Sequence, residues 1–243
     1  FNGNAQSKVL ELPDFNSGKT VWIVRVGVDF NSATGDWKDM QRDAWEKSHK
    51  IDLIKSDFPG STGFDVTVGF NKSFGAMPLY WGMDLGIATR GYKSAAEWYS
   101  GKVSSTFGDY IGHRIKEDVS LTAYNVNFTP FKLGYKYTFL KRMAVDVHLG
   151  GFVSFDFAGT YKIDNYDWQT SSGQPRTKEE STSVSIGDLD KYRRFDAGLN
   201  LGIGYWYGHF NIDLTWQKGF INMYDMDNSM KSQALKLSIG YAF

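Results

Sequence analysis

Apolar and polar residues alternate with a period of two along most of the chain. The alternation is clearest at its C-terminal end, where small or polar residues separate the large apolar ones: Leu235, Leu237, Ile239, Tyr241 and Phe243. A period of two places successive side chains on opposite faces of a β-strand. One face of this strand is therefore apolar, and the other is small or polar.

The same pattern occurs in eight segments, which predicts eight strands. They cover, in order, residues 22–30, 64–70, 79–88, 124–139, 145–157, 195–207, 210–217 and 235–243. In the fourth segment the apolar positions are even up to Phe128 and odd from Phe131 onwards, so the parity changes at Thr129 and Pro130. We predict a β-bulge there, which would also explain how a strand accommodates a proline.

Short and long connections alternate strictly between these segments. The short ones lie around 71–77, 140–143 and 208–209, and the long ones at 31–61, 91–118, 162–190 and 221–232. Transmembrane barrels have short periplasmic turns and long extracellular loops. The sequence therefore predicts an all-β fold, an eight-stranded antiparallel up-and-down transmembrane β-barrel over residues 19–243. Residues 1–18 are expected to form a periplasmic N-terminal extension.

Two further features favour a membrane barrel over a soluble one. Aromatic residues gather near the short turns, as in the interface girdle of membrane barrels: Trp22, Phe70, Trp81, Tyr137, Phe139, Tyr205, Tyr207, Phe210, Tyr241 and Phe243. A soluble lipocalin-like barrel would place its apolar residues inside, whereas the polar face here carries glycines and unlike charges that suit a narrow, wet interior.

The hydropathy of the chain and its first residues also bear on the expected location of the protein. The mean hydropathy of −0.39 is that of a soluble protein, but a membrane strand needs only about 9–11 residues with one apolar face. The chain begins at Phe1 without a charged and apolar leader, so we expect a mature form from which a signal peptide has been removed. The expected location is the bacterial outer membrane, with outer-membrane lipid around the barrel.

The charge balance and the absence of cysteine exclude several classes of function. Lys plus Arg and Asp plus Glu number 27 each, so nothing suggests nucleic-acid binding. Without cysteine there is no disulfide, no thiolate nucleophile and no cysteine-ligated zinc. We expect no cofactor and no metal.

The polar face of the strands carries both acids and bases. We expect these side chains to point inward and to form an interior charge network: Arg25, Asp29, Asp65, Asp84, Arg90, Lys132, Lys136, Asp146, His148, Asp156, Asp196, Asp213 and Lys236. Eight strands enclose an interior that side chains fill, and buried charges must be paired. A salt-bridged plug is the preferred interpretation, and a proton or ion path is the alternative.

Candidate catalytic residues are few. His148 lies close to Asp146 and Asp156 on one predicted face, and His113 follows Ser104 and Ser105 in a predicted loop. The Gly-x-Ser-x-Gly pattern of a nucleophile elbow is absent from the sequence. We therefore expect no catalytic residue.

Two of the predicted loops are candidates for contact with a surface partner. In 31–61, Trp37, Met40, Ala44 and Trp45 recur at helical spacing, which predicts a short amphipathic helix. This helix could lie over the barrel mouth, pack on other loops or bind a partner. The loop 162–190 is rich in Ser, Thr and charged residues and is interpreted as mobile surface.

Parts of the sequence also resemble a known family. Residues 125–137 (NVNFTPFKLGYKY), 147–155 (VHLGGFVSF) and the terminal 240–243 resemble the PorT-like outer-membrane β-barrel family of Gram-negative bacteria, and the resemblance spans about 18–243. It implies an eight-stranded barrel and no single activity, so no catalytic residue is carried over. The final stripe also resembles the C-terminal signal read by the barrel-assembly machinery: Leu237, Ile239, Tyr241 and Phe243.

The expected function follows from these observations. We expect an integral outer-membrane barrel without catalytic activity, in a structural, surface-interaction or assembly-associated role. A narrow channel for small solutes or ions is the first alternative. An outer-membrane lipid-modifying enzyme is the second.

Overall fold

The computed structural model describes residues 11–13, 18–39, 41–43, 53–75, 77–100, 113–169, 177–226 and 228–243. These residues form a 10-stranded antiparallel sheet. Its strands are β1 (Thr20–Thr34), β2 (Leu53–Asp57), β3 (Ser61–Ser73), β4 (Leu79–Ser100), β5 (His113–Leu140), β6 (Met143–Gln169), β7 (Thr177–Ser185), β8 (Phe195–Tyr207), β9 (Phe210–Asn222) and β10 (Lys231–Ala242).

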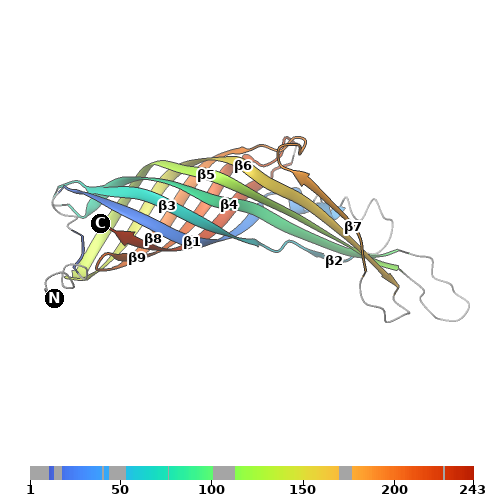
Figure 1. Cartoon of the computed structure of the whole chain (residues 1–243), viewed down its shortest axis with the longest axis horizontal. Helices are drawn as coiled ribbons and strands as arrows, with labels where there is room; N and C mark the ends of the chain where they lie inside the picture. Colours follow the sequence, from blue (N-terminus) through green and yellow to red (C-terminus); the bar gives the residue numbers. More distant parts are fainter. Residues whose placement is uncertain are drawn as a thin grey trace, which may run out of the picture.

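Eight of the strands close into a barrel (Figure 1). Going around the ring, the order is β1, β3, β4, β5, β6, β8, β9 and β10, and β10 pairs with β1. Each strand of the ring thus pairs with the next one along the chain, which is up-and-down topology. The predicted eight-stranded antiparallel barrel is confirmed.

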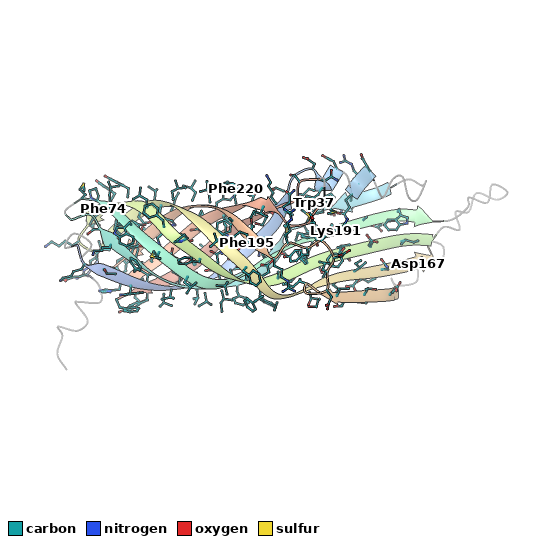
Figure 2. The ribbon with its side chains drawn as sticks, turned by 90° about the horizontal axis from the view of Figure 1, so that it is seen from above. Trp37, Phe74, Asp167, Lys191, Phe195 and Phe220 are labelled. Atoms are coloured by element: carbon teal, nitrogen blue, oxygen red, sulfur yellow. The ribbon has the colours of Figure 1, made fainter. Side chains whose placement is uncertain are left out.

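The two faces of the wall have opposite character. Large apolar side chains on the outer face are about half exposed, for example Val26 at 56% and Ile203 at 59%, whereas polar side chains on the inner face are buried. Figure 2 shows these outward side chains along the ring, from Phe74 at the short-turn end to Phe195 and Phe220 about halfway along the molecule. Lipid is the solvent that makes such an apolar outer band stable.

The bulge predicted at Thr129 and Pro130 is present in β5. The pairing with β4 moves from Gly82 opposite Lys132 to Asp84 opposite Thr129, so β5 has one more residue in this step than β4. The pairing with β6 is interrupted between Phe128 and Phe131. Pro130 therefore lies where the ladder is broken and where its missing N–H costs no hydrogen bond.

The strands at the extracellular end are longer than predicted. Residues 91–100 and 113–118 belong to β4 and β5, and residues 162–169 and 177–185 belong to β6 and β7. The prediction of loops at 91–118 and 162–190 was therefore wrong for these ranges. The predicted loop 31–61 was also wrong in part, because residues 31–34 belong to β1 and residues 53–57 form β2. Figure 1 shows β4, β5, β6 and β7 running far beyond the closed ring. The extension is the open sheet formed by β2, β7 and the parts of β4, β5 and β6 that run beyond the ring. These parts have no lipid-facing stripe, and backbone pairing with their neighbours stabilises them.

Of the segment predicted to form an amphipathic helix, the described residues 37–39 and 41–43 are helical. Met40, Ala44 and Trp45 lie outside the described residues. Trp37 is buried at the barrel mouth and packs against connecting segments, which agrees with the first and the second of the three predicted placements. Within the described part of the chain, no helix has the length and apolar character needed to cross a bilayer.

Candidate functional site: the barrel interior

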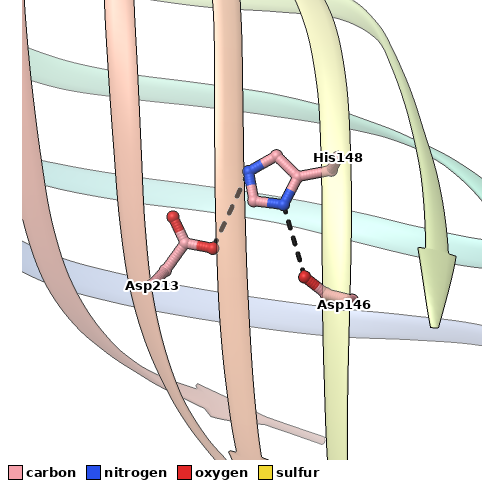
Figure 3. Close-up of side chains that lie close together, drawn as sticks. All are labelled: Asp146, His148 and Asp213. Atoms are coloured by element: carbon pink, nitrogen blue, oxygen red, sulfur yellow. Dashed lines mark hydrogen bonds and ion pairs between the residues drawn. The ribbon is translucent and has the colours of Figure 1, made fainter. Parts of the chain in front are cut away.

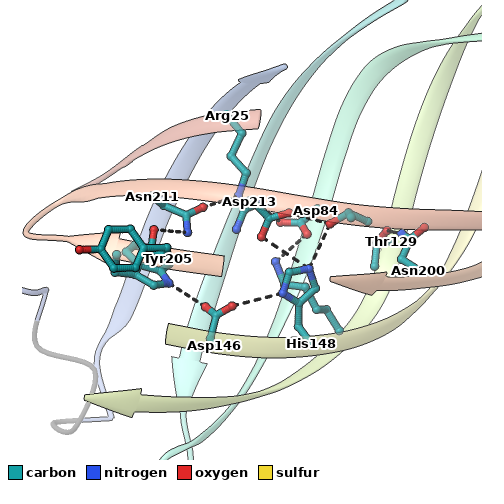
Figure 4. A network of polar contacts seen from close by, with 12 residues as sticks. Arg25, Asp84, Thr129, Asp146, His148, Asn200, Tyr205, Asn211 and Asp213 are labelled. Atoms are coloured by element: carbon teal, nitrogen blue, oxygen red, sulfur yellow. Dashed lines mark hydrogen bonds and ion pairs between the residues drawn. The ribbon is translucent and has the colours of Figure 1, made fainter. Parts of the chain in front are cut away.

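Charged side chains meet inside the barrel in two clusters. The periplasmic cluster, near the short turns, consists of Arg25, Asp84, Lys132, Asp146, His148 and Asp213. Lys132 Nζ lies 2.6 Å from Asp84 Oδ2, and Arg25 Nη1 lies 3.2 Å from Asp84 Oδ1. Arg25 Nε also donates to Asn211 Oδ1 at 3.3 Å. Asp84 on β4 is thus held by cations from β1 and β5 (Figure 4).

His148 lies between two carboxylates in the same cluster (Figure 3). Its Nδ1 is 3.4 Å from Asp146 Oδ1, and its Nε2 is 3.7 Å from Asp213 Oδ2. The Thr215 hydroxyl is 3.3 Å from Nε2 and donates to Asp213 Oδ1 at 2.6 Å. The imidazole therefore bridges β6 and β9 across the interior.

The donor atoms of Asp146, His148 and Asp213 lie within 4.8 Å of one another, which is a spacing that a metal ion could use. The two carboxylates face opposite nitrogens of the ring, however, and one ion can bind only one of these nitrogens. Asp146 Oδ2 also accepts a hydrogen bond from Trp206 Nε1 at 2.7 Å. The geometry is that of a hydrogen-bonded bridge.

The same atoms have the connectivity of a nucleophile, a base and an acid, in the order Thr215, His148 and Asp146. A nucleophile must be reachable by its substrate, and this hydroxyl borders an interior cavity of only about 70 Å³. Its proton is already donated to Asp213. The arrangement can order the interior, and it lacks the access that catalysis requires.

The extracellular cluster is centred on Arg90 of β4. Its Nη2 donates to Asp156, to the Tyr192 hydroxyl at 3.1 Å and to the Arg193 carbonyl at 3.0 Å, and its Nη1 lies 3.2 Å from Asp196 Oδ2. Tyr192 also donates to Asp156 Oδ2 at 2.5 Å. This cluster therefore joins the barrel wall to the segment between β7 and β8.

Asp196 is the best-satisfied carboxylate of the extracellular cluster. It accepts hydrogen bonds from the backbone N–H groups of Ala197 at 2.8 Å and Ile221 at 3.3 Å, and from the Ser232 hydroxyl. Between the two clusters, Lys236 Nζ lies 3.9 Å from Asp29 Oδ2. Asp65 and Lys236 line the central cavity together with residues of the periplasmic cluster.

Apolar side chains close both ends of this polar interior. The periplasmic seal contains Val21, Ile23, Ala144, Trp206 and Ala242, with Leu12 packed against it. The Lys136 ammonium lies 3.5 Å from the centre of the Trp206 ring, which is a favourable cation–π position. Trp206 is fully buried in this seal.

The extracellular seal is built in equal parts from strand residues and from segments that connect the strands. Its buried members are Ala33, Trp37, Tyr92, Leu121, Ala123, Ile186, Met223 and Met230. Trp37 contacts Phe58 edge-on, with ring centres 5.0 Å apart, and Tyr92 shares a 3.0 Å hydrogen bond with Tyr224. Burial raises the pKa of the Tyr224 hydroxyl, so this contact joins two neutral groups.

The structure places the charged residues singled out in the sequence on the inner face. They are buried there, apart from Asp84 and Lys236, whose side chains are 16% and 14% exposed. The C-terminal stripe lies on the outer face of β10, and Phe243 exchanges backbone hydrogen bonds with Trp22 of β1 at 2.9 and 3.1 Å. His113, expected in a loop, is instead the first residue of β5.

Sequence reasoning missed the aromatic partners of the charges. The inward position of Trp206 could have been predicted from the sequence, because it is a large apolar residue at a polar-face position of its strand. Tyr192 carried none, because it lies outside the regular strands and reaches Asp156 only through the folded chain.

Comparison with known protein families supports the fold. The profile of the outer membrane protein beta-barrel domain matches residues 5–225. No curated protein matches. Among solved structures, neisserial surface protein A is 12% identical with a TM-score of 0.39, over 91% of this chain and 97% of that one. Ail, the attachment invasion locus protein of Yersinia pestis, is 17% identical with a TM-score of 0.37, over 93% of this chain and 99% of that one.

Proposed function

Since the chain belongs to the outer membrane protein beta-barrel domain family and lies in the bacterial outer membrane, we propose that it is a closed, non-catalytic barrel whose extension mediates interactions at the cell surface. The observation that carries this proposal is the continuation of β4, β5 and β6 beyond the ring, where β2 and β7 join them. A barrel serving only as a membrane plug needs no such structure.

The edges of the extension suit recognition. Among the described residues, β2 pairs only with β4, and β7 pairs only with β6. A strand at the edge of a sheet presents backbone N–H and C=O groups that an extended partner segment can pair with. Polar residues such as Glu180, Ser181 and Thr182 on β7 keep this edge soluble.

A narrow channel is the second candidate, favoured by the cavity of about 70 Å³ that acids and bases line at the centre of the barrel. Conduction would require displacement of both the periplasmic and the extracellular seal. A lipid-modifying enzyme is a weaker candidate, because the hydrogen-bonded side chains of Thr215, His148 and Asp146 are enclosed in the barrel interior.

Three finer assignments belong to the same proposal. We propose kinship with PorT-like members of the family on the basis of residues 125–137 and 147–155. We propose that the stripe from Leu237 to Phe243 is read by the barrel-assembly machinery during insertion. Residues 1–18 are proposed to be periplasmic, because Leu12 packs on the seal at that end.

The first experiment removes the extension and keeps the barrel. One variant carries two deletions. A short turn replaces residues 95–116 and joins β4 to β5, and a second short turn replaces residues 162–183 and joins β6 to the segment before β8. Bacteria that display the wild type should adhere and autoaggregate, and bacteria that display this variant should lose both properties. Heat-modifiable mobility on gels shows that the barrel still folds, and deletion of residues 1–10 is the matched control. Equal adhesion by both forms would contradict the proposal.

Planar-bilayer recording separates the closed barrel from the channel. The wild type should show no conductance steps. Steps whose size changes with Asp65→Asn or Lys136→Ala would establish the channel instead. Incubation with lipid A and phospholipids, with His148→Ala as control, tests for the enzyme, and turnover that depends on His148 would overturn the non-catalytic assignment.

A further inference from the structure

We propose that the outer wall formed by β1, β3, β4 and β5, together with the outward face of the extension above it, binds an acylated, phosphate-bearing lipid of the lipid A class. Two separate observations carry this inference. One is the order of charges on the outward face just above the apolar band. The other is an apolar trough in the band itself.

The registers of β4, β5, β6 and β7 sort the outward residues into rows. The row nearest the apolar band is Gly91, Thr122, Thr160 and Ser185. The next row is Lys93, Ser120, Lys162 and Ser183, and the one beyond it is Ala95, Asp118, Asp164 and Ser181. The first charged row above the membrane is therefore purely basic, and carboxylates begin only one row further out.

This order matches the chemistry of an anionic headgroup layer. Lys93 is exposed, and Lys162 is separated from it by one strand, which places the two about 10 Å apart at the usual strand spacing. Hydroxyl groups lie on either side of the lysines and can donate to phosphate oxygens. Lys162 Nζ also lies 2.7 Å from Asp164, so the acidic row anchors this lysine from the side facing away from the membrane.

The basic row borders a groove of about 590 Å³ on the same outward face. Lys93, Ser120 and Asp164 line it, and its outer part carries both bases and acids: Lys55, Asp57, Glu97, Lys116 and Asp118. Lys116 is paired with Asp118 at 2.5 Å. Among the described residues, Lys93 pairs with no carboxylate, so it is the lysine best placed to meet a ligand.

The trough lies lower on the same wall. Its volume is about 370 Å³, and it is lined by Val24, Val66, Thr67, Val68, Leu85, Gly86, Ile87 and Val126. Aromatic contacts border it on the periplasmic side, where Phe70 lies 5.5 Å from Trp22 and 5.2 Å from Trp81. Phe64 and Tyr124, 6.2 Å apart, border it on the extracellular side. Short β-branched side chains between bulky aromatic ones leave room for a hydrocarbon chain.

The distance between the two features fits one amphiphile. Lys93 and Ile87 are six positions apart on β4, which is about 20 Å along the strand and about 15 Å along the membrane normal at the usual tilt. Half of a hydrocarbon core of about 30 Å is about 15 Å. An acyl chain that begins below the basic row therefore reaches the trough within one leaflet.

The outward face of the extension meets the headgroups of the outer leaflet, which favours lipid A over an inner-leaflet lipid. Lipid A offers phosphates to the lysines and several acyl chains to the wall. An anionic phospholipid shares both kinds of group, and a second copy of this chain could also cover the trough. The experiment is designed to separate these three occupants.

The test uses the full chain in nanodiscs, with native mass spectrometry to count retained lipids. Discs contain phosphatidylcholine with either lipid A or phosphatidylglycerol added. The wild type should retain lipid A in preference to phosphatidylglycerol. Lys93→Glu should weaken lipid A retention at least about fivefold, the effect of one lysine at an anionic surface. Its control, Lys141→Glu in a periplasmic turn, should have no effect.

The trough is tested by filling it. Ile87→Trp places a bulky side chain in the trough, and Ile203→Trp on β8 is the matched control on the opposite wall. Only Ile87→Trp should reduce lipid A retention, and heat-modifiable mobility verifies that every variant is folded. Three outcomes would each overturn the proposal. The wild type could retain the two lipids equally, or both tryptophan variants could lose lipid A equally. The wild type could also be a dimer that Ile87→Trp makes monomeric.

Discussion

The two charge clusters inside the barrel differ in what they connect. The periplasmic cluster joins strand to strand, since its residues come from β1, β4, β5, β6 and β9. The extracellular cluster joins the wall to a connecting segment, because Arg90 and Asp156 bind Tyr192 and the Arg193 carbonyl. Similar chemistry thus serves two purposes: one cluster fixes the shape of the ring, and the other holds the extracellular seal in the mouth.

The difference also appears in how each cluster pairs its cations with its carboxylates. In the periplasmic cluster, Asp84 is bound by two cations, Arg25 and Lys132, so the loss of one cation leaves another. In the extracellular cluster, one cation, Arg90, is shared by two carboxylates, Asp156 and Asp196. The extracellular cluster should therefore be more sensitive to a single substitution.

The largest expected effect comes from Arg90→Ala. This change leaves two buried carboxylates without their shared cation, which costs about 3–5 kcal/mol. It should also release the segment around Tyr192 and loosen the extracellular seal. Urea unfolding of the barrel in lipid vesicles measures the loss, and proteolysis of residues 186–194 on intact cells measures the release.

Arg90→Lys is the matched control for this prediction. It keeps the charge but cannot reach Asp156, Asp196 and Tyr192 at once, so its loss should be smaller than that of Arg90→Ala. If Arg90→Ala unfolded at the same urea concentration as the wild type, the central role of Arg90 would be wrong.

His148→Leu should have an intermediate effect of about 1–3 kcal/mol. The bridge between Asp146 and Asp213 is lost, but each carboxylate retains a donor, Trp206 for the first and Thr215 for the second. The same unfolding assay applies. Adding Trp206→Phe to this variant should cost more than the sum of the two single changes, because Asp146 then loses both partners. Simple additivity would show that the two donors act independently.

Arg193→Gln should have the smallest effect. Arg193 pairs with Asp225 at 2.5 Å between the segments of the extracellular seal, but the two side chains are 48% and 69% exposed. Exposed ion pairs contribute at most about 1 kcal/mol. A loss as large as that of Arg90→Ala would mean that the seal depends on its surface pairs rather than on the buried cluster.

Much of the fold could be predicted because the membrane imposes a simple rule on every strand. Lipid outside and polar groups inside require alternation, so the parity of Val24, Val26 and Arg25 already separated the two faces. The same rule exposed the bulge at Pro130, where the parity changes. The rule no longer applies beyond the membrane, where both faces of β6 and β7 carry polar residues, so these strands were mistaken for a loop.

The sequence alone determined the ring strands, their inward and outward faces and the set of charges inside, because each follows from local alternation against lipid. Only the tertiary structure decided which charges pair. Arg25 meets Asp84 and Asn211, which are 59 and 186 positions away, because closure of the ring brings distant strands face to face. The seals were decided in the same way, since residues from several strands and connecting segments meet only where the barrel ends.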